Sequence, residues 1–177
     1  MLHVIGVLVA VLVLGPSQPA PGAVQPSLDT GQGVVFLVRH AERADAGMAA
    51  AKMAGADPEL SDAGKARAAS LAALLKDAKI TAIFTTEYKR TRDTAQPLAA
   101  ATGIASTAVV SKDAASLIDK VKASAGNVLV VGHSNTLPEI IKALGIGEPV
   151  SIAEDQFDNL FVVVRGPKPA LLRLHYR

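Results

Sequence analysis

The sequence predicts an α/β fold in three layers, with a mainly parallel central sheet covered by helices on both faces. Two patterns lead to this prediction. Short runs of β-branched and other apolar residues alternate with longer Ala- and Leu-rich segments, and these runs are apolar on both faces, as buried parallel strands are. With 177 residues, the chain is long enough for one domain with a hydrophobic core and too short to suggest two.

The expected elements follow one another in a regular order. Residues 34–38 (Val-Val-Phe-Leu-Val) form the first buried strand. The first helix covers residues 61–78, with Ser61 as its N-cap and an apolar face made by Leu71, Leu74, Leu75 and Ala78. Further strands are expected at 80–85, 107–110, 128–131, 160–164 and 171–175, and further helices at 88–101, 113–123 and 137–144.

The first residues differ in composition from the rest of the chain. Residues 2–14 are almost wholly apolar, and a stretch rich in Pro, Gly, Ala and Gln follows them. The apolar run is shorter than the roughly 20 residues that span a bilayer, and small residues follow it. We therefore expect a signal peptide over 1–23, a flexible linker over 24–32, and export to the periplasm or the medium. The alternatives are an uncleaved apolar tail and a misassigned start codon.

Composition narrows the function classes. The chain has no cysteine, which excludes thiol catalysis, disulfides and a lipid-anchored lipoprotein. Its net charge is only +2, and aromatic residues make up only 3% of it, so a nucleic-acid partner is not expected. After removal of the leader, we also expect no stable insertion into a membrane.

Three polar clusters lie at or directly after expected strands. Residues 39–43 (Arg-His-Ala-Glu-Arg) follow the first strand, residues 85–90 (Thr-Thr-Glu-Tyr-Lys-Arg) lie at the end of the second, and residues 132–135 (Gly-His-Ser-Asn) follow the strand over 128–131. In open α/β sheets, ligands bind at the carboxyl ends of the strands. The sequence therefore predicts one site that contains two histidines and several arginines.

These residue types suit a phosphoryl group. The guanidinium group of arginine is always charged and binds phosphate oxygens in a bidentate manner. A neutral imidazole is a competent nucleophile near pH 7, and its attack on phosphorus gives a phosphohistidine. Fixed cations stabilise the charge that spreads over the phosphoryl oxygens during transfer.

Four segments resemble the motifs of the histidine phosphatase superfamily, the phosphoglycerate-mutase-like group. Arg39-His40 within residues 38–42 resembles the Arg-His-Gly signature, and residues 60–64 resemble the Leu-Ser/Thr-x-x-Gly helix start. Residues 86–95 are similar to the Ser-x-x-x-Arg-Ala-x-x-Thr-Ala segment, and residues 131–133 are similar to the second-histidine motif. They occur in the family's order over nearly all of residues 33–177, which we expect to be the histidine phosphatase domain. The short chain implies a phosphohistidine-phosphatase-like branch without a cap domain.

The resemblance implies a role for four residues. His40 would be the nucleophile and Arg39 a phosphate clamp. Arg90, from its place in the third motif, would be the second clamp. His133 would bind a phosphate oxygen and stabilise the transferring group.

Three further residues have a functional and a structural interpretation. Arg43 would be a third clamp, as in the acid-phosphatase branch, or a solvated loop arginine. Asn135 would contact phosphate at a helix N-terminus or cap that helix. Arg92 is the alternative to Arg90 as second clamp, and otherwise a solvated helix arginine.

The sequence departs from the family pattern at the nucleophile and at the proton donor. Ala41 replaces the glycine after the nucleophile, and Ala46 replaces an asparagine of the mutase branch. Glu42 is expected to be either the acid or an orienting group. The other candidates for the acid are Asp113, Asp119, Glu139, Glu154 and Asp155, and Asp113 has a helix cap as its alternative role.

The sequence thus predicts an exported, metal-independent phosphatase, without a cofactor, that forms a phosphohistidine on His40. A phosphorylated small molecule, glycan or protein would be the substrate, and a phosphoramidate or anhydride would suit a site without a dedicated acid. One alternative is a non-catalytic phosphate- or phosphoprotein-binding module. A metal-dependent hydrolase built on His40 and His133 is disfavoured, because Arg39 would repel a divalent cation. Specificity is expected to lie in residues 44–59 and 151–158.

Overall fold

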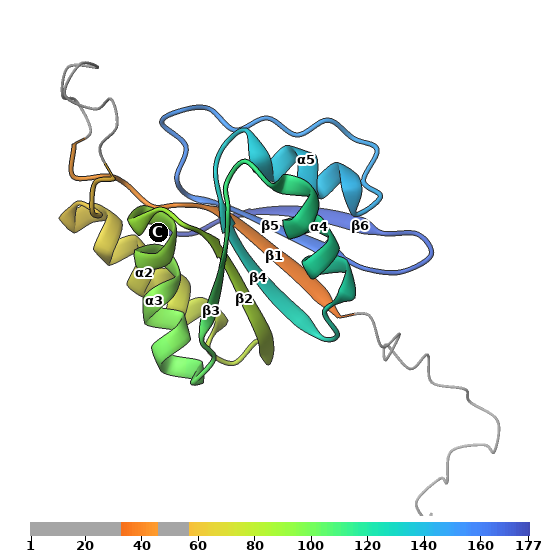
Figure 1. The fold of residues 1–177 in the computed structure, drawn as a ribbon, viewed down its shortest axis with the longest axis horizontal. Helices are drawn as coiled ribbons and strands as arrows, with labels where there is room; N and C mark the ends of the chain where they lie inside the picture. The colour runs from red at the N-terminus through yellow and green to blue at the C-terminus, as the bar shows by residue number, and fades with distance from the viewer. Residues whose placement is uncertain (1–32, 46–56) are drawn as a thin grey trace, which may run out of the picture.

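The computed structural model describes residues 33–45 and 57–177 (Figure 1). These residues form a six-stranded sheet in the order β3-β2-β4-β1-β5-β6, flanked by helices. The predicted three-layer α/β/α architecture is confirmed. The predicted signal peptide and linker, and most of the Ala-rich stretch that begins at residue 44, lie outside the described residues. No described helix is both long enough and apolar enough to span a membrane.

Four strands form the parallel part of the sheet. They are β1 (Val34–Arg39), β4 (Asn127–Gly132), β2 (Ile80–Thr86) and β3 (Ser106–Val109). The central strand β4 pairs with β1 on one side and with β2 on the other, and both pairings are parallel. The carboxyl ends of β1, β2 and β4 therefore meet at one edge of the sheet.

The last two strands form an antiparallel edge. β5 (Asn159–Val164) pairs with β1, and β6 (Ala170–His175) pairs with β5. Because β5 runs against β1, its first residues lie beside the last residues of β1, with Leu160 opposite Val38. The loop that precedes β5 is therefore delivered to the edge where the parallel strands end.

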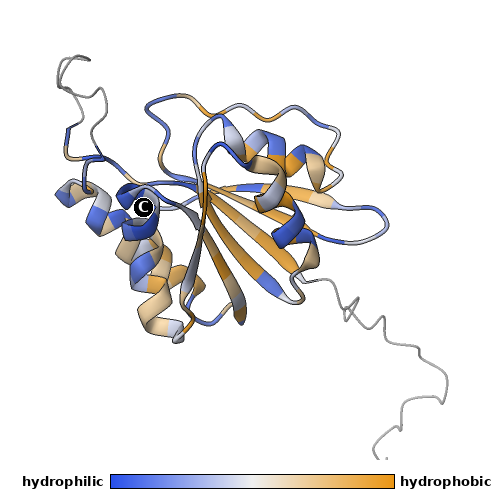
Figure 2. Ribbon diagram, in the orientation of Figure 1, coloured by the Kyte–Doolittle hydropathy of each residue, from blue (hydrophilic) through white to orange (hydrophobic). Residues whose placement is uncertain are grey.

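Two helix pairs cover the two faces of the sheet. α2 (Asp62–Leu75) and α3 (Lys89–Thr102) pack over one apolar cluster, and α4 (Ala114–Ala123) and α5 (Thr136–Ala143) pack over the other. Figure 2 shows the strands between them as mostly hydrophobic. The core therefore lies on both faces of the parallel strands, as the unbroken apolar runs predict.

The observed boundaries lie within three residues of the predicted ones. The first helix ends at Leu75 instead of residue 78, and the side chain of Leu74, predicted to be apolar and buried, is 54% exposed. The buried face is made instead by Ala68, Leu71, Ala72 and Leu75.

Candidate active site

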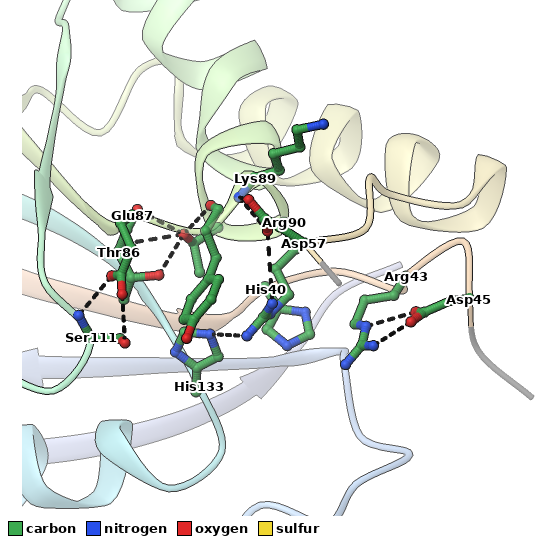
Figure 3. Close-up of polar contacts among 12 residues, drawn as sticks. His40, Arg43, Asp45, Asp57, Thr86, Glu87, Lys89, Arg90, Ser111 and His133 are labelled. Carbon is green, nitrogen blue, oxygen red and sulfur yellow. Dashed lines mark hydrogen bonds and ion pairs between the residues drawn. The ribbon is translucent and has the colours of Figure 1, made fainter. Parts of the chain in front are cut away.

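Three strand ends bring the predicted residues together. Arg39 is the last residue of β1, and His40 follows it directly. His133 follows β4, and Arg90 lies in the first turn of α3, just after β2. The His40 backbone N–H donates to Gly132 O at 2.9 Å, which joins the end of β1 to the end of β4. The two imidazole rings lie edge to face with centroids 5.3 Å apart, and Figure 3 shows both beside Arg90.

The His40 ring is held in one tautomer. Its Nδ1 lies 2.8 Å from Ala41 O, and a carbonyl oxygen only accepts, so Nδ1 carries the proton and Nε2 keeps its lone pair. The side chain is buried, with 3% of the residue exposed. Burial, together with the electrostatic effects of His133, Arg39 and Arg90, lowers the pKa of His40 to about 3 despite the hydrogen bond to Ala41. The ring is therefore neutral near pH 7, with a free lone pair on Nε2.

Backbone contacts fix the loop around His40. Ala41 N–H donates to Thr94 Oγ1 at 2.9 Å, and Ser61 N–H donates to Glu42 O at 2.9 Å. A Cβ at position 64 would lie 2.2 Å from Glu42 O, so only glycine fits there. This gives a physical reason for the Leu-Ser-x-x-Gly pattern, because Ser61 caps α2 and Gly64 lets the helix approach the loop closely.

Arg90 and His133 form a pair. Arg90 Nη2 lies 3.0 Å from His133 Nε2, and a guanidinium only donates, so this imidazole nitrogen accepts and Nδ1 carries the proton. Burial and the charge of Arg90 lower the pKa of His133 to about 4. The guanidinium of Arg90 also stacks on the Tyr88 ring, 4.0 Å from its centroid. Tyr88 belongs to none of the residue types that the sequence patterns select, and only its position before Arg90 could have indicated it.

Arg39 points towards the loop that precedes β5. Its Nη1 donates to Ala153 O at 3.0 Å and to Glu154 O at 2.8 Å, and its Nη2 donates to Glu154 Oε2 at 3.0 Å. The guanidinium stacks on Phe157, 4.3 Å from the ring centroid. Phe157 also lies 6.0 Å from the His40 ring. The loop thus forms one wall of the site, in the segment 151–158 where specificity was predicted.

Arg39 and Arg90 each keep a buried donor without an acceptor among the described residues. Their Nε atoms are buried and have no hydrogen-bond partner within residues 33–45 and 57–177. Burial also lowers the pKa of both guanidinium groups, although both stay charged near neutral pH. Unpaired buried donors are costly and rare. Two of them beside a pair of histidines fit an anion with several oxygens, such as phosphate.

Sequence and structure comparisons agree with this geometry. The family model described as histidine phosphatase superfamily (branch 1) matches residues 35–113, which contain the first three motifs. The SixA protein from Agrobacterium tumefaciens is 27% identical and has a TM-score of 0.50, with 75% of this chain and 91% of that chain covered. Over residues 35–113 the chain is therefore similar to the histidine phosphatase superfamily.

Other solved structures share the fold of this superfamily. The protein histidine phosphatase SixA, complexed with tungstate, is 18% identical over 80% of this chain and 96% of that chain, with a TM-score of 0.62. A mycobacterial glucosyl-3-phosphoglycerate phosphatase, complexed with inorganic phosphate, is 16% identical over 79% of this chain and 95% of that chain, with a TM-score of 0.61. The chain spans nearly the whole length of these proteins. No curated protein sequence matches it.

The structure also places Arg43 and Asn135, the two further predicted phosphate contacts. Arg43 pairs with Asp45 through its Nε and Nη2 atoms, and Figure 3 shows this pair beside His40. Its charge nevertheless lowers the pKa of Arg90 and of His133. Asn135 is at the N-cap position of α5 without a side-chain capping bond. Third-clamp and phosphate-contact roles for these two residues stay predictions.

Glu42 is engaged by Arg67 and not by the site. Arg67 Nε and Nη2 donate to the carboxylate at 2.7 to 3.0 Å, and Arg67 Nη1 donates to Tyr176 O at 2.9 Å. Burial raises the pKa of Glu42, but the Arg67 hydrogen bonds outweigh it and hold the pKa below its usual range. Glu42 therefore orients the loop and is a poor proton donor.

The remaining acid candidates do not converge on His40. Asp113 caps α4 by accepting from Ser116 N–H at 3.0 Å, which is its alternative role. Glu154 is bound to Arg39. A cleft of about 460 Å³ opens beside Arg90 and His133, and its lining includes Tyr88, Ser111, Lys112, Asn135 and Glu139. Glu139 thus lies on the wall of the space next to the clamps.

Proposed function

We propose that this chain is an exported, metal-independent phosphatase that forms a phosphohistidine on His40. One observation carries the proposal. The His40 ring is buried and neutral, its Nδ1–H is held by Ala41 O, and its Nε2 lone pair is left for attack among two clamp arginines and His133.

The chemistry takes two displacements at phosphorus. In the first, His40 Nε2 attacks, a P–N bond forms, and the leaving group departs with the electron pair of its bond and takes a proton from solvent. In the second, water attacks phosphorus, the P–N bond breaks, and its electron pair returns to Nε2 as phosphate is released. Arg39, Arg90 and His133 Nδ1–H stabilise the charge on the phosphoryl oxygens in both steps.

The carboxylates near the site favour substrates with good leaving groups. Glu42 and Glu154 both form ion pairs with arginines, and the hydrogen bonds from Arg67 hold the pKa of Glu42 below its usual range. A leaving group that needs little help from an acid, such as that of a phosphoramidate or an anhydride, suits this arrangement. The structural likeness to the protein histidine phosphatase SixA supports phosphohistidine as one such substrate. Phosphomonoesters of small molecules, glycans or proteins are the other candidates.

Two features of the proposal have their own tests. The apolar leader supports export, and its cleavage should give a mature N-terminus between residues 20 and 32 in the periplasm or medium, measured by mass spectrometry.

Within residues 33–45 and 57–177, no three His, Asp or Glu side chains form a group that could hold a metal ion. Turnover of an aryl phosphate should therefore be unchanged by EDTA, and loss that zinc restores would contradict metal independence.

The alternative function is a non-catalytic phosphate-binding module. The ion pairs that Glu42 and Glu154 form with arginines favour it, because neither of these two carboxylates is free to protonate a leaving group. The wild-type chain should release phosphate from 4-nitrophenyl phosphate and form an acid-labile phosphoprotein on rapid quenching. His40→Ala should do neither and should keep the circular dichroism of the wild type. A wild-type chain that binds phosphate but releases none from any phosphate compound would establish the alternative.

A further inference from the structure

A carboxylate of the chain already occupies one phosphate clamp. Glu154 Oε2 accepts from Arg39 Nη2 at 3.0 Å, and Glu154 Oε1 accepts from the Ser134 hydroxyl at 3.1 Å. Ser134 directly follows His133, so the carboxylate links Arg39, at the end of β1, to the loop after β4. Both of its oxygens are bound by donors that lie next to the proposed phosphate site.

Arg39 does not need this carboxylate to stay in place. Its Nη1 is held by the backbone oxygens of Ala153 and Glu154, and its guanidinium stacks on Phe157. The Glu154 side chain, in contrast, is 86% exposed, and these two contacts are the hydrogen bonds that its carboxylate makes with the described residues. It is therefore a partner that Arg39 can exchange.

Phosphate and the Glu154 carboxylate need the same donor. The outer edge of a guanidinium binds an oxyanion through Nε and one terminal nitrogen in a bidentate manner. On Arg39, Nε has no partner among the described residues, and Nη2 donates to Glu154. Full engagement of phosphate on this edge requires that Nη2 leave the carboxylate, and two anions on one guanidinium also repel each other.

We propose that Glu154 competes with phosphate for Arg39 and promotes the release of inorganic phosphate. When the product dissociates, the carboxylate returns to Nη2, so the guanidinium is not left without an anionic partner. This lowers the affinity of the site for the product and, to a similar degree, for the substrate. The inference rests on the proposed function, in that the anion bound at Arg39 is a phosphate.

The test is the affinity for inorganic phosphate, measured by titration calorimetry near pH 7. Glu154→Gln removes the charge and keeps the shape, and because the side chain is exposed, the fold should not change. Exposed ion pairs are worth up to about 1 kcal/mol, so phosphate should bind about three- to fivefold more tightly. Inhibition of aryl phosphate turnover by phosphate should strengthen by the same factor.

Asp155→Asn is the matched control. It removes one negative charge at the neighbouring position, and Asp155 acts on Arg39 through its charge, without a hydrogen bond or ion pair to the described residues. Phosphate affinity in this variant should change by less than about 1.5-fold, since the charge is screened by solvent. An equal gain in both variants would show a general charge effect and overturn the proposal.

Other outcomes separate this inference from the proposed function. Unchanged or weaker phosphate binding in Glu154→Gln would overturn the competition and make Glu154 a positioning residue for Arg39. Calorimetry needs no turnover. If the chain hydrolyses no phosphate compound and Glu154→Gln still binds phosphate more tightly than wild type, the proposed enzymatic function is refuted and the competition is supported. If the wild-type chain is an active phosphatase and Glu154→Gln leaves its phosphate affinity unchanged, the competition is refuted and the proposed function is supported.

Discussion

The parallel part of the sheet and its antiparallel edge contribute to the site in different ways. The parallel part supplies His40, Arg90 and His133, each within a few residues of a strand end that backbone hydrogen bonds hold. The edge supplies Glu154 and Phe157 from the loop before β5. The groups proposed to react with phosphorus thus stand at the ends of strands and in the first turn of a helix, and the groups proposed to adjust Arg39 stand on a loop. Variants in the parallel part should therefore reduce turnover, and variants at the edge should mainly change binding.

The largest effect is expected from the nucleophile. His40→Asn should lower kcat by about 10⁴-fold or more, as loss of a nucleophile does in other enzymes. His133→Asn keeps the nucleophile and should lower kcat by about 10²–10³-fold, as loss of one transition-state donor does. Steady-state kinetics on an aryl phosphate measure both. Equal losses would show that the two histidines act as one unit.

Substitution of Arg90 tests whether this residue is the second phosphate clamp. Arg90→Ala should lower kcat/KM by about 10²–10³-fold, because a donor to the phosphoryl oxygens and the partner of His133 are both lost. Arg90→Lys should have a higher kcat/KM than Arg90→Ala but a lower one than wild type, since lysine does not bind phosphate oxygens in a bidentate manner. Arg92→Ala is the control, and it should keep wild-type kinetics. A larger loss in Arg92→Ala than in Arg90→Ala would exchange the roles of the two residues.

The close approach of α2 to the catalytic loop should be sensitive to one methyl group. Gly64→Ala would place a Cβ 2.2 Å from Glu42 O, so the helix or the loop must move, at about 1–3 kcal/mol of unfolding free energy. Gly147→Ala, in the loop after α5, meets nothing within 4 Å and should be nearly neutral. Urea denaturation of both variants measures the difference. Similar midpoints would mean that the contact at Gly64 carries no strain.

Acid should destabilise the parallel part through His40. Its folded pKa is about 3, below the unfolded value of about 6.5, so the unfolded chain binds a proton first as pH falls. The stability that the neutral His40 ring gives to the folded state is fully present above pH 6.5 and is lost as pH falls towards 3. At pH 5 the free energy of unfolding should be about 2 kcal/mol lower for this reason. His40→Asn should therefore lose less stability than wild type between pH 7 and 5 in urea denaturation. Parallel pH curves for the two proteins would contradict the lowered pKa.

Sequence patterns predicted the strands of both parts and the residues at the ends of the parallel strands, but they did not predict the contacts made by the edge loop and by Glu42, for a physical reason. Unbroken apolar runs identify buried strands, and polar residues at their ends mark where a ligand binds, so His40, Arg90 and His133 could be placed together. The partners of Arg39 carry no such signal, because two of them are backbone oxygens of Ala153 and Glu154. The ion pair between Glu42 and Arg67 joins residues 25 positions apart, and it depends on how α2 packs. Contacts of this kind follow from tertiary packing and not from local pattern.

The smallest effects compare the two aromatic rings under the clamps. Phe157 lies 4.3 Å from the Arg39 guanidinium, and Tyr88 lies 4.0 Å from that of Arg90. Such a contact is worth about 0.5–2 kcal/mol. After Phe157→Leu, three hydrogen bonds to the loop still hold Arg39, so KM should rise about twofold and kcat should stay unchanged.

Tyr88→Leu should have the greater effect of the two. Arg90 is left with one bond to His133 and an Asp57 contact at 4.0 Å, so this variant should raise KM about fivefold and also lower kcat. Steady-state kinetics of both variants on one aryl phosphate make the comparison, and thermal denaturation checks that each is folded. If Phe157→Leu lowered kcat as much as Tyr88→Leu, the loop before β5 would contribute to transition-state stabilisation. This would contradict the view that the antiparallel edge mainly affects binding.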